Sequence, residues 1–134
     1  MIEGLSHLTF IVRDLDKMEE ILTKVLDARK IYDSGDQSFS LSQERFFDIS
    51  GIWVAIMEGE ALSEKNFYHV AFKISTDDYE TRLKCVRALG LEIKEGRSRV
   101  TGEGRSLYFY DHDKHLFELH TGTRAERLER YAKG

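Results

Sequence analysis

The sequence predicts an α+β fold built from two tandem βαβββ units. First, two strand-like stretches, LSHLTFIV (residues 5–12) and FYHVAFKI (residues 67–74), each carry a histidine as their third residue. Second, each stretch is followed by a helical pattern and then by three further strand-like stretches. Third, the polar segment 58–66 separates the two halves. We therefore expect a single domain over residues 1–134, with units over 1–60 and 66–122 and a C-terminal helix over 123–134.

Composition argues against several classes of protein. The chain has 134 residues, a net charge of −4 and no basic stripe with interleaved aromatics, so we expect no nucleic-acid partner. No apolar run is long enough to cross a membrane, and the first residues do not form a signal peptide, so we expect no membrane association. The single cysteine, Cys85, excludes an intrachain disulfide and favours a reducing, cytoplasmic location.

The first half begins with a strand and a helix. Side chains alternate along Leu5–Val12, so His7, Thr9 and Ile11 share one face. Asp14 suits a helix N-cap, because its side chain can accept a hydrogen bond from a free N–H group of the first turn. The apolar residues that follow recur at helical spacing: Leu15, Met18, Leu22, Val25 and Leu26.

Three strands are expected after this helix. Arg29–Tyr32 is a short strand that ends in a turn over residues 34–36. Phe39–Leu41 and Phe46–Ile49 are expected to form one strand, interrupted by the polar residues 42–45. Ile52–Met57 is almost entirely apolar, which predicts a strand that is central in its sheet or buried on both faces.

The second half repeats this order. After the strand over residues 67–74, a helical pattern ends at Gly90, and Leu91–Lys94 is a short strand. Ser106–Tyr110 and Leu116–Thr121 are expected to form a hairpin around the polar turn 111–114. A last helix is expected over Arg124–Ala132, with Leu128 pointing inward. The apolar stripe of the middle helix consists of Tyr79, Leu83, Val86 and Leu89.

Two histidines and one glutamate are candidate metal ligands. His7 and His69 occupy equivalent positions in the two units, and Glu118 lies mid-strand between two apolar residues. A carboxylate at such a position is costly to bury unless it is paired or binds a metal. Two imidazoles and one carboxylate suit Mn, Fe, Co, Ni or Zn. Two alternatives stay open from the residues alone: Glu118 faces solvent on a half-exposed strand, or His120, on the same strand face, is a ligand.

Four segments resemble a known superfamily. SHLTFIV, YHVAF, GEGRSLYFYD and HLFELHTGT are similar to the vicinal oxygen chelate superfamily, and specifically to its fosfomycin resistance enzymes, over nearly the whole chain. The resemblance implies a Mn(II) site made by His7, His69 and Glu118, without His120. It also implies that the paired units form a cup-shaped mixed sheet around the metal, in a domain-swapped homodimer whose subunits complete each other's sites.

The segment FSLSQERFF resembles the hydrating branch of these enzymes, the FosX type. This implies a metal-dependent hydrolase that adds water to the epoxide of fosfomycin, a phosphonate, and produces the diol. It also implies that Glu44 is the general base, although from the residues alone Glu44 in a polar stretch would be a surface side chain. The chemistry agrees, because a carboxylate can take the proton of the attacking water while the metal polarises the epoxide oxygen.

Further residues match the substrate site of this family. A phosphonate needs fixed cationic or hydroxyl donors, preferably arginine. The resemblance implies that Arg127, Ser106 and Tyr108 hold the phosphonate. The remaining matches are Thr9 beside the epoxide oxygen, Trp53 as an aromatic wall and Arg99 as a weaker choice for a further cation.

Three other functions fit parts of the pattern. A glutathione or thiol transferase would use the same metal site, but the segment RSRVTGEGRS lacks the lysine of that branch. A non-enzymatic drug-binding protein would have no use for three polar ligands that point inward. An Fe(II) dioxygenase shares the ligand set, but such members of the superfamily are longer. Tyr68 stands where the hydrating branch is expected to have asparagine, and hydration is nevertheless the expected reaction.

Overall fold

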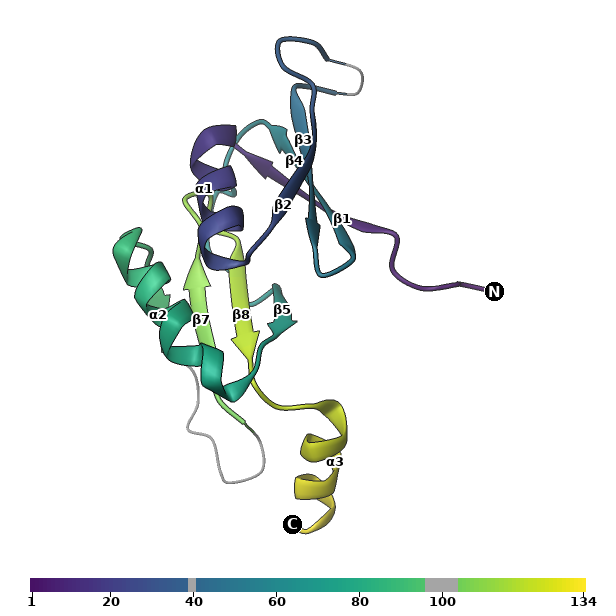
Figure 1. Cartoon of the computed structure of the whole chain (residues 1–134), viewed down its shortest axis with the longest axis vertical. Helices are drawn as coiled ribbons and strands as arrows, with labels where there is room; N and C mark the ends of the chain where they lie inside the picture. Colours follow the sequence, from purple (N-terminus) through teal and green to yellow (C-terminus); the bar gives the residue numbers. More distant parts are fainter. Residues whose placement is uncertain (39–40, 96–103) are drawn as a thin grey trace. The chain divides into compact units, whose positions relative to one another are not determined.

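Two compact units make up the part of the chain that the structure describes. The structure is a computed structural model, and it describes residues 1–38, 41–95 and 104–134. The first unit is Met1–Ser63 and the second is Glu64–Gly134. Each unit has its own four-stranded sheet (Figure 1).

Both units have the predicted order of a strand, a helix and three further strands. The first contains β1 (His7–Val12), α1 (Leu15–Val25), β2 (Arg29–Asp33), β3 (Glu44–Ile49) and β4 (Ile52–Glu58). The second contains β5 (His69–Lys73), a 3-10 turn (Thr76–Asp78), α2 (Tyr79–Ala88), β6 (Ile93–Lys94), β7 (Ser106–Tyr110), β8 (Leu116–His120) and α3 (Arg124–Ala132). The predicted α+β class and the repeated βαβββ order are confirmed.

The two sheets share one topology. The strand order is β1-β4-β3-β2 in the first unit and β5-β8-β7-β6 in the second. The strands that come first and last in each unit along the chain, β1 with β4 and β5 with β8, pair in parallel. All other neighbouring strands are antiparallel. The histidine is the first residue of the first strand in both units, and it lies opposite Trp53 in β4 and opposite Leu116 in β8. The repeat therefore extends from the order of elements to the pairing of the strands.

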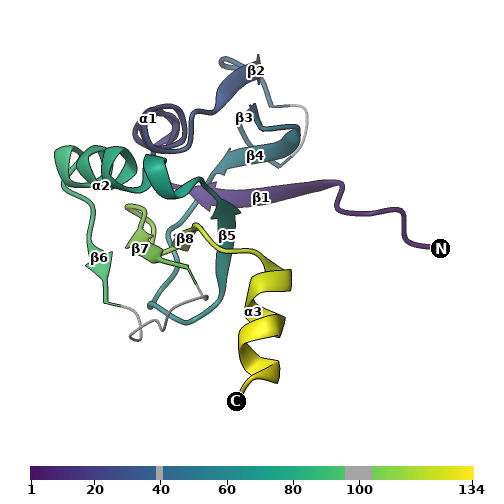
Figure 2. The same ribbon diagram turned by 60° about the horizontal axis from the view of Figure 1, so that its bottom comes forward.

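Helix α1 covers one face of the first sheet and packs against β4 (Figure 2). Asp14 is its N-cap, as predicted, and its Oδ1 accepts a hydrogen bond from the Lys17 N–H at 3.1 Å. Strand β4 is central, as predicted, and four consecutive residues of it are buried. Ile21 is buried, and so are all the residues of the predicted apolar stripe: Leu15, Met18, Leu22, Val25 and Leu26.

A two-residue turn sets the register of β3 against β4. Ile49 pairs with Ile52, and the residues between them, Ser50 and Gly51, have positive φ angles of 50° and 88°. Turns with two positive φ angles match the right-handed twist of the strands that they join. The Asp48 side chain also accepts a hydrogen bond from the Gly51 N–H at 2.8 Å. This register places Glu44 opposite Met57.

The second unit buries its core between α2 and the hairpin of β7 and β8 (Figure 1). Phe109 and Phe117 are fully buried, and their rings stack with centroids 5.6 Å apart. The Asp111 carboxylate organises the turn between the strands, because its Oδ1 accepts hydrogen bonds from the N–H groups of Asp113 and His115, both at 2.9 Å. The hairpin predicted from the sequence is therefore confirmed, with β8 ending at His120.

Two predicted details of the fold are wrong. Leu41 lies in a bend, and β3 begins at Glu44, whose N–H donates to Ser34 Oγ at 3.0 Å; Phe39 lies outside the described residues. The polar residues Glu44 and Arg45 therefore belong to the strand rather than to an interruption of it. Leu128 does not point inward: the residue is 59% exposed, and no residue of α3 is buried. None of the helices in the described ranges is long and apolar enough to span a bilayer.

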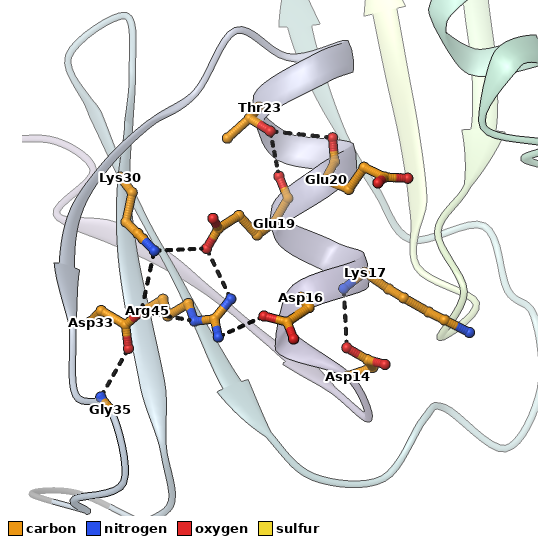
Figure 3. Close-up of polar contacts among 10 residues, drawn as sticks. All are labelled: Asp14, Asp16, Lys17, Glu19, Glu20, Thr23, Lys30, Asp33, Gly35 and Arg45. Atoms are coloured by element: carbon orange, nitrogen blue, oxygen red, sulfur yellow. Dashed lines mark hydrogen bonds and ion pairs between the residues drawn. The ribbon is translucent and has the colours of Figure 1, made fainter.

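Arg45 joins β3 to α1 and β2 through a cluster of ion pairs (Figure 3). Its guanidinium lies 2.8 Å from Asp16 Oδ1, 2.9 Å from Glu19 Oε1 and 3.3 Å from Asp33 Oδ2. Lys30 adds a second cation, 3.3 Å from Glu19 and 3.2 Å from Asp33. Because the Arg45 side chain is only 16% exposed, solvent screens these contacts less than those of a surface pair. The cluster connects three elements on the helix-covered side of the sheet.

Replacing Arg45 by methionine tests this cluster. We predict that Arg45→Met lowers the free energy of unfolding by about 1–2 kcal/mol. This loss is at the lower end of the range for hydrogen bonds between charged groups, because the Asp16 side chain is exposed to solvent. The measurement is urea denaturation of the full chain. Arg29→Met is the matched control, because Arg29 is 75% exposed and its pair with Asp48 is 3.9 Å long, and it should cost about 0.5 kcal/mol or less. Equal losses in the two variants would contradict the prediction.

The same cluster predicts a pH dependence. A hydrogen bond from the Gly35 N–H, together with Lys30 and Arg45, lowers the pKa of Asp33 below its ordinary value of 3.8, although partial burial opposes this effect. The carboxylate therefore stabilises the folded chain above about pH 3.8, and this contribution is lost as the pH falls through the lowered folded-state pKa. We predict that Asp33→Asn is less stable than the parent protein at neutral pH, and that the difference shrinks in acid. Urea denaturation at a series of pH values measures it, and a constant difference would contradict the assignment.

Candidate metal centre

Glu118 lies in the middle of the second sheet. It belongs to β8, between β5 and β7, and it pairs with Ala71 on one side and Tyr108 on the other. The residue is only 6% exposed, so the alternative of a solvent-facing glutamate is wrong. His69, two residues before Ala71 in β5, contacts the Glu118 carboxylate.

His69 and Glu118 bring a nitrogen and an oxygen together. His69 Nε2 lies 3.1 Å from Glu118 Oε1, and His69 Nδ1 lies 2.9 Å from the backbone oxygen of Phe67. Because a carbonyl oxygen only accepts hydrogen bonds, Nδ1 carries a proton and Nε2 is the nitrogen with the available lone pair. Two lone-pair atoms at this distance require a cation between them, either a proton or a metal ion. The pair therefore fits two ligands of a divalent metal.

Ser106 and His120 lie on the other side of the Glu118 carboxylate. Ser106 Oγ is 2.6 Å from Glu118 Oε2 and 2.7 Å from His120 Nδ1. The side chains of Glu118 and His120 are 7% and 14% exposed. The contact among Ser106, Glu118 and His120 is not predicted from the sequence. The pairing of the hairpin strands could have indicated it, because it places Ser106 directly opposite His120 on the face that carries Glu118.

Four predicted site residues share one face of the first sheet. His7 pairs with Trp53, and their ring centroids are 4.2 Å apart. Thr9 follows His7 on the same face, and the pairing of Glu44 with Met57 puts Glu44 there as well, since side chains alternate along β4. This face is opposite the one that α1 covers. Trp53 is 37% exposed, and His7 and Thr9 are also exposed within the unit.

The backbone of Glu44 is fixed while its carboxylate is available. The Glu44 N–H donates to Ser34 Oγ, and its carbonyl accepts from the Ser34 N–H, both at 3.0 Å. Among the residues that the structure describes, no side chain hydrogen-bonds or ion-pairs with the Glu44 carboxylate. Its neighbour Arg45 points to the helix-covered face and is occupied there (Figure 3). Among the described residues, no cationic side chain therefore pairs with the Glu44 carboxylate.

The other predicted substrate residues are distributed over the second unit. Tyr108 packs edge-to-face with His69, with ring centroids 5.8 Å apart. Arg127 lies on α3, where its guanidinium is 6.0 Å from the centroid of the Tyr131 ring and its buried Nε has no hydrogen-bond acceptor among the described residues. Arg99 lies outside the described residues. The roles of these residues toward a substrate stay predictions.

Within either unit, the described residues include no group of three histidine, cysteine, aspartate or glutamate side chains placed to hold a metal ion. His69 and Glu118 of the second unit stay two predicted ligands of one centre. His7 carries an imidazole whose Nδ1 is 2.9 Å from Ser6 Oγ, and it stays the predicted third ligand.

Comparison with known proteins identifies the family. The model of the Glyoxalase/Bleomycin resistance protein/Dioxygenase superfamily matches residues 4–119. The fosfomycin resistance protein FosX of Listeria innocua is 56% identical, over 99% of this chain and 100% of its own length. A metallothiol transferase FosB of Bacillus licheniformis is 34% identical, over 96% of this chain and 81% of its own.

Solved structures agree with this result. A variant of FosX from Listeria monocytogenes, in complex with Mn(II) and 1S,2S-dihydroxypropylphosphonic acid, has a TM-score of 0.89 and 49% identity, over 98% of this chain and 99% of that one. The chain therefore belongs to the Glyoxalase/Bleomycin resistance protein/Dioxygenase superfamily and, within it, to the FosX fosfomycin resistance proteins.

The contact between His7 and Trp53 provides a test of the third ligand. Trp53 is the only tryptophan of the chain. We predict that a paramagnetic divalent ion such as Co(II) quenches its fluorescence, because the ion binds to the imidazole that lies against the indole. His7→Ala should abolish the quenching, whereas replacement of the exposed turn residue His112 by alanine should leave it unchanged. Quenching that persists in His7→Ala would exclude His7 as a ligand.

Proposed function

We propose that this protein is a Mn(II)-dependent hydrolase that adds water to the epoxide of fosfomycin and produces the diol phosphonate, and thereby confers resistance. The closer relatives support this assignment, because the FosX proteins are 54–59% identical and the FosB thiol transferases 30–34%. The Listeria monocytogenes protein whose fold matches was crystallised with Mn(II) and a dihydroxypropylphosphonic acid, which is a diol phosphonate.

The observation that carries the proposal is the position of Glu44. A carboxylate with no cationic partner among the described residues shares a sheet face with His7 and Thr9, a predicted metal ligand and a predicted epoxide contact. Hydration needs such a group, because water is a weak nucleophile until a base takes its proton. A thiol transferase does not need this base, since its nucleophile is an added thiol that ionises more readily.

The residues then divide the reaction between them. Glu44 accepts a proton from water as the water oxygen bonds to one epoxide carbon. The bond from that same carbon to the ring oxygen breaks on the opposite side, and the released oxygen takes up a proton from solvent to give the second hydroxyl. His7, His69 and Glu118 would hold Mn(II), which supplies Lewis-acid stabilisation of that oxygen when it is bound. Thr9 would lie beside the epoxide oxygen and Trp53 would form the wall of the site.

Arginine and hydroxyl donors would bind the other end of the substrate. The phosphonate is anionic, and Arg127, with a buried Nε that lacks an acceptor among the described residues, is a suitable partner. Tyr108 offers a hydroxyl on the same sheet face as His69 and Glu118. Arg99 stays a weaker choice for a further cation.

The proposal includes a homodimer and a cytoplasmic location. Two ligands lie in the second unit and the predicted third in the first, so exchange of units between two copies is one way to complete each centre. The single free thiol, Cys85, is compatible with a reducing compartment.

Phosphorus NMR of fosfomycin with the protein and Mn(II) tests the reaction. We predict conversion to the diol phosphonate without any thiol, and a loss of at least about 100-fold in rate in Glu44→Gln, because the amide cannot accept the proton. Metal binding should be unchanged in this variant. Glu58→Gln is the matched control, because Glu58 lies on the neighbouring strand and points to the opposite face.

The outcomes separate the possible functions. Product that forms only after addition of glutathione would overturn hydration in favour of thiol transfer. Substrate that binds without any product would favour a sequestering protein. Full activity of Glu44→Gln would remove Glu44 from the mechanism, whatever the reaction.

A further inference from the structure

The Glu118 carboxylate is held from the side that faces away from His69. Ser106 is the first residue of β7 and pairs with His120, the last residue of β8. Both side chains point to the face that carries Glu118, because His120 lies two positions further along β8. The contacts are short: 2.6 Å from Ser106 Oγ to Glu118 Oε2, and 2.7 Å from Ser106 Oγ to His120 Nδ1.

The protons of this group can be assigned from its chemistry. A carboxylate only accepts hydrogen bonds, and a serine hydroxyl has one proton to donate. Ser106 therefore donates to Glu118 Oε2, at a length typical of a bond between a hydroxyl and a carboxylate. The Ser106 oxygen is then left to accept, so His120 donates to it from Nδ1. The direction of donation runs from His120 through Ser106 to Glu118.

This chain determines how the carboxylate is rotated. With Oε2 bound by Ser106, Oε1 is the oxygen that faces His69 Nε2, at 3.1 Å. Glu118 is thereby preset to offer one oxygen to an ion and to keep the other for the protein. A ligand that is fixed before binding loses less conformational entropy when the ion arrives.

The backbone around Ser106 makes the arrangement rigid. The hairpin continues beyond the last strand pair, because the Thr121 N–H donates to the Arg105 carbonyl at 3.0 Å and the Arg105 N–H donates to Thr121 Oγ1 at 2.8 Å. Gly104 has a φ of +78°, and a Cβ atom there would lie 2.6 Å from the Gly122 nitrogen. This close approach, possible only for glycine, keeps the ends of β7 and β8 together.

We propose that Ser106 and His120 are positioning residues that orient Glu118 for metal binding. This role rests on the metal site of the proposed function, and it differs from the predicted contact of Ser106 with the phosphonate. In that contact the hydroxyl would donate its single proton to the substrate, whereas here the proton is committed to Glu118. Partners behind a metal ligand commonly change metal affinity by about 10–100-fold when they are removed.

Titration with Mn(II), followed by the EPR signal of the free ion, tests the proposal on the full chain. We predict that Ser106→Ala raises the Kd for Mn(II) about 10–100-fold, that Ser106→Thr restores most of the affinity, and that the KM for fosfomycin at saturating Mn(II) stays within about twofold. Ser75→Ala is the matched control, because Ser75 precedes the 3-10 turn of the same unit and its side chain makes no capping hydrogen bond. It should bind Mn(II) like the parent protein.

A second pair of variants makes the same test from the histidine. His120→Asn keeps an N–H that can donate to Ser106, and His120→Leu does not, so Mn(II) affinity should fall further in His120→Leu. These variants decide the question if Ser106→Ala does not fold, which circular dichroism would reveal.

The result that overturns the proposal is specific. Parent-like Mn(II) affinity in Ser106→Ala, combined with a raised KM for fosfomycin, would make Ser106 a substrate contact and not a positioning residue. Failure of the proposed function is a separate outcome: the parent protein would bind Mn(II) and form no diol, while the affinities of the variants would still decide the role of Ser106 and His120.

Discussion

A buried carboxylate has to be surrounded by donors or cations, and in the second unit this requirement falls on Glu118. Burial of an unpaired negative charge costs several kcal/mol, so the neighbouring strands must supply partners. Ser106 provides a hydroxyl at 2.6 Å from one carboxylate oxygen, and His69 Nε2 lies 3.1 Å from the other, where a cation between the two atoms would complete the set. The central position of β8 matters here, because only a central strand has a neighbour on each side to provide these groups.

In the first unit, the ion-pair cluster and the predicted site residues lie on opposite faces of the sheet. Arg45 and its acidic partners lie on the face that α1 covers, where they connect β2, β3 and the helix (Figure 3). Glu44, the adjacent residue, points the other way. Because neighbouring residues of a strand face opposite sides, one dipeptide contributes both to stability and to the candidate site. Changes on one face can therefore leave the chemistry of the other intact.

Alternation and helical spacing were sufficient to predict most of the fold. The histidine in each first strand indicated the repeat, and the caps and stripes located the helices, because local side-chain patterns determine which face is buried. Leu128 was predicted inward and is exposed, since a helical stripe does not indicate whether anything covers it. The start of β3 at Glu44 is not predictable from the local pattern. Glu44 and Arg45 are polar, and their partners, Ser34 and Glu19 of α1, lie far from them in the sequence.

The candidate site was less accessible from the sequence than the fold. Burial of Glu118 and its contact with His69 depend on the parallel pairing of β5 with β8, which no short-range pattern specifies. The contact between Ser106 and His120 depends on the register of β7 against β8, which the length of the turn between these strands determines. The predicted role of Glu44 rests on resemblance, because a glutamate in a polar stretch has no local feature that distinguishes a base from a surface charge.

The shared topology of the two sheets has a consequence for how the predicted ligands are distributed. When His7 is aligned with His69, Ala55 occupies the position of Glu118, and Glu44 occupies the position of Ser106. The two units thus share a histidine at this position and differ at the two others. With one predicted carboxylate ligand for two predicted imidazole ligands, the proposed centre would hold one ion per polypeptide, and neither unit alone would supply the whole set.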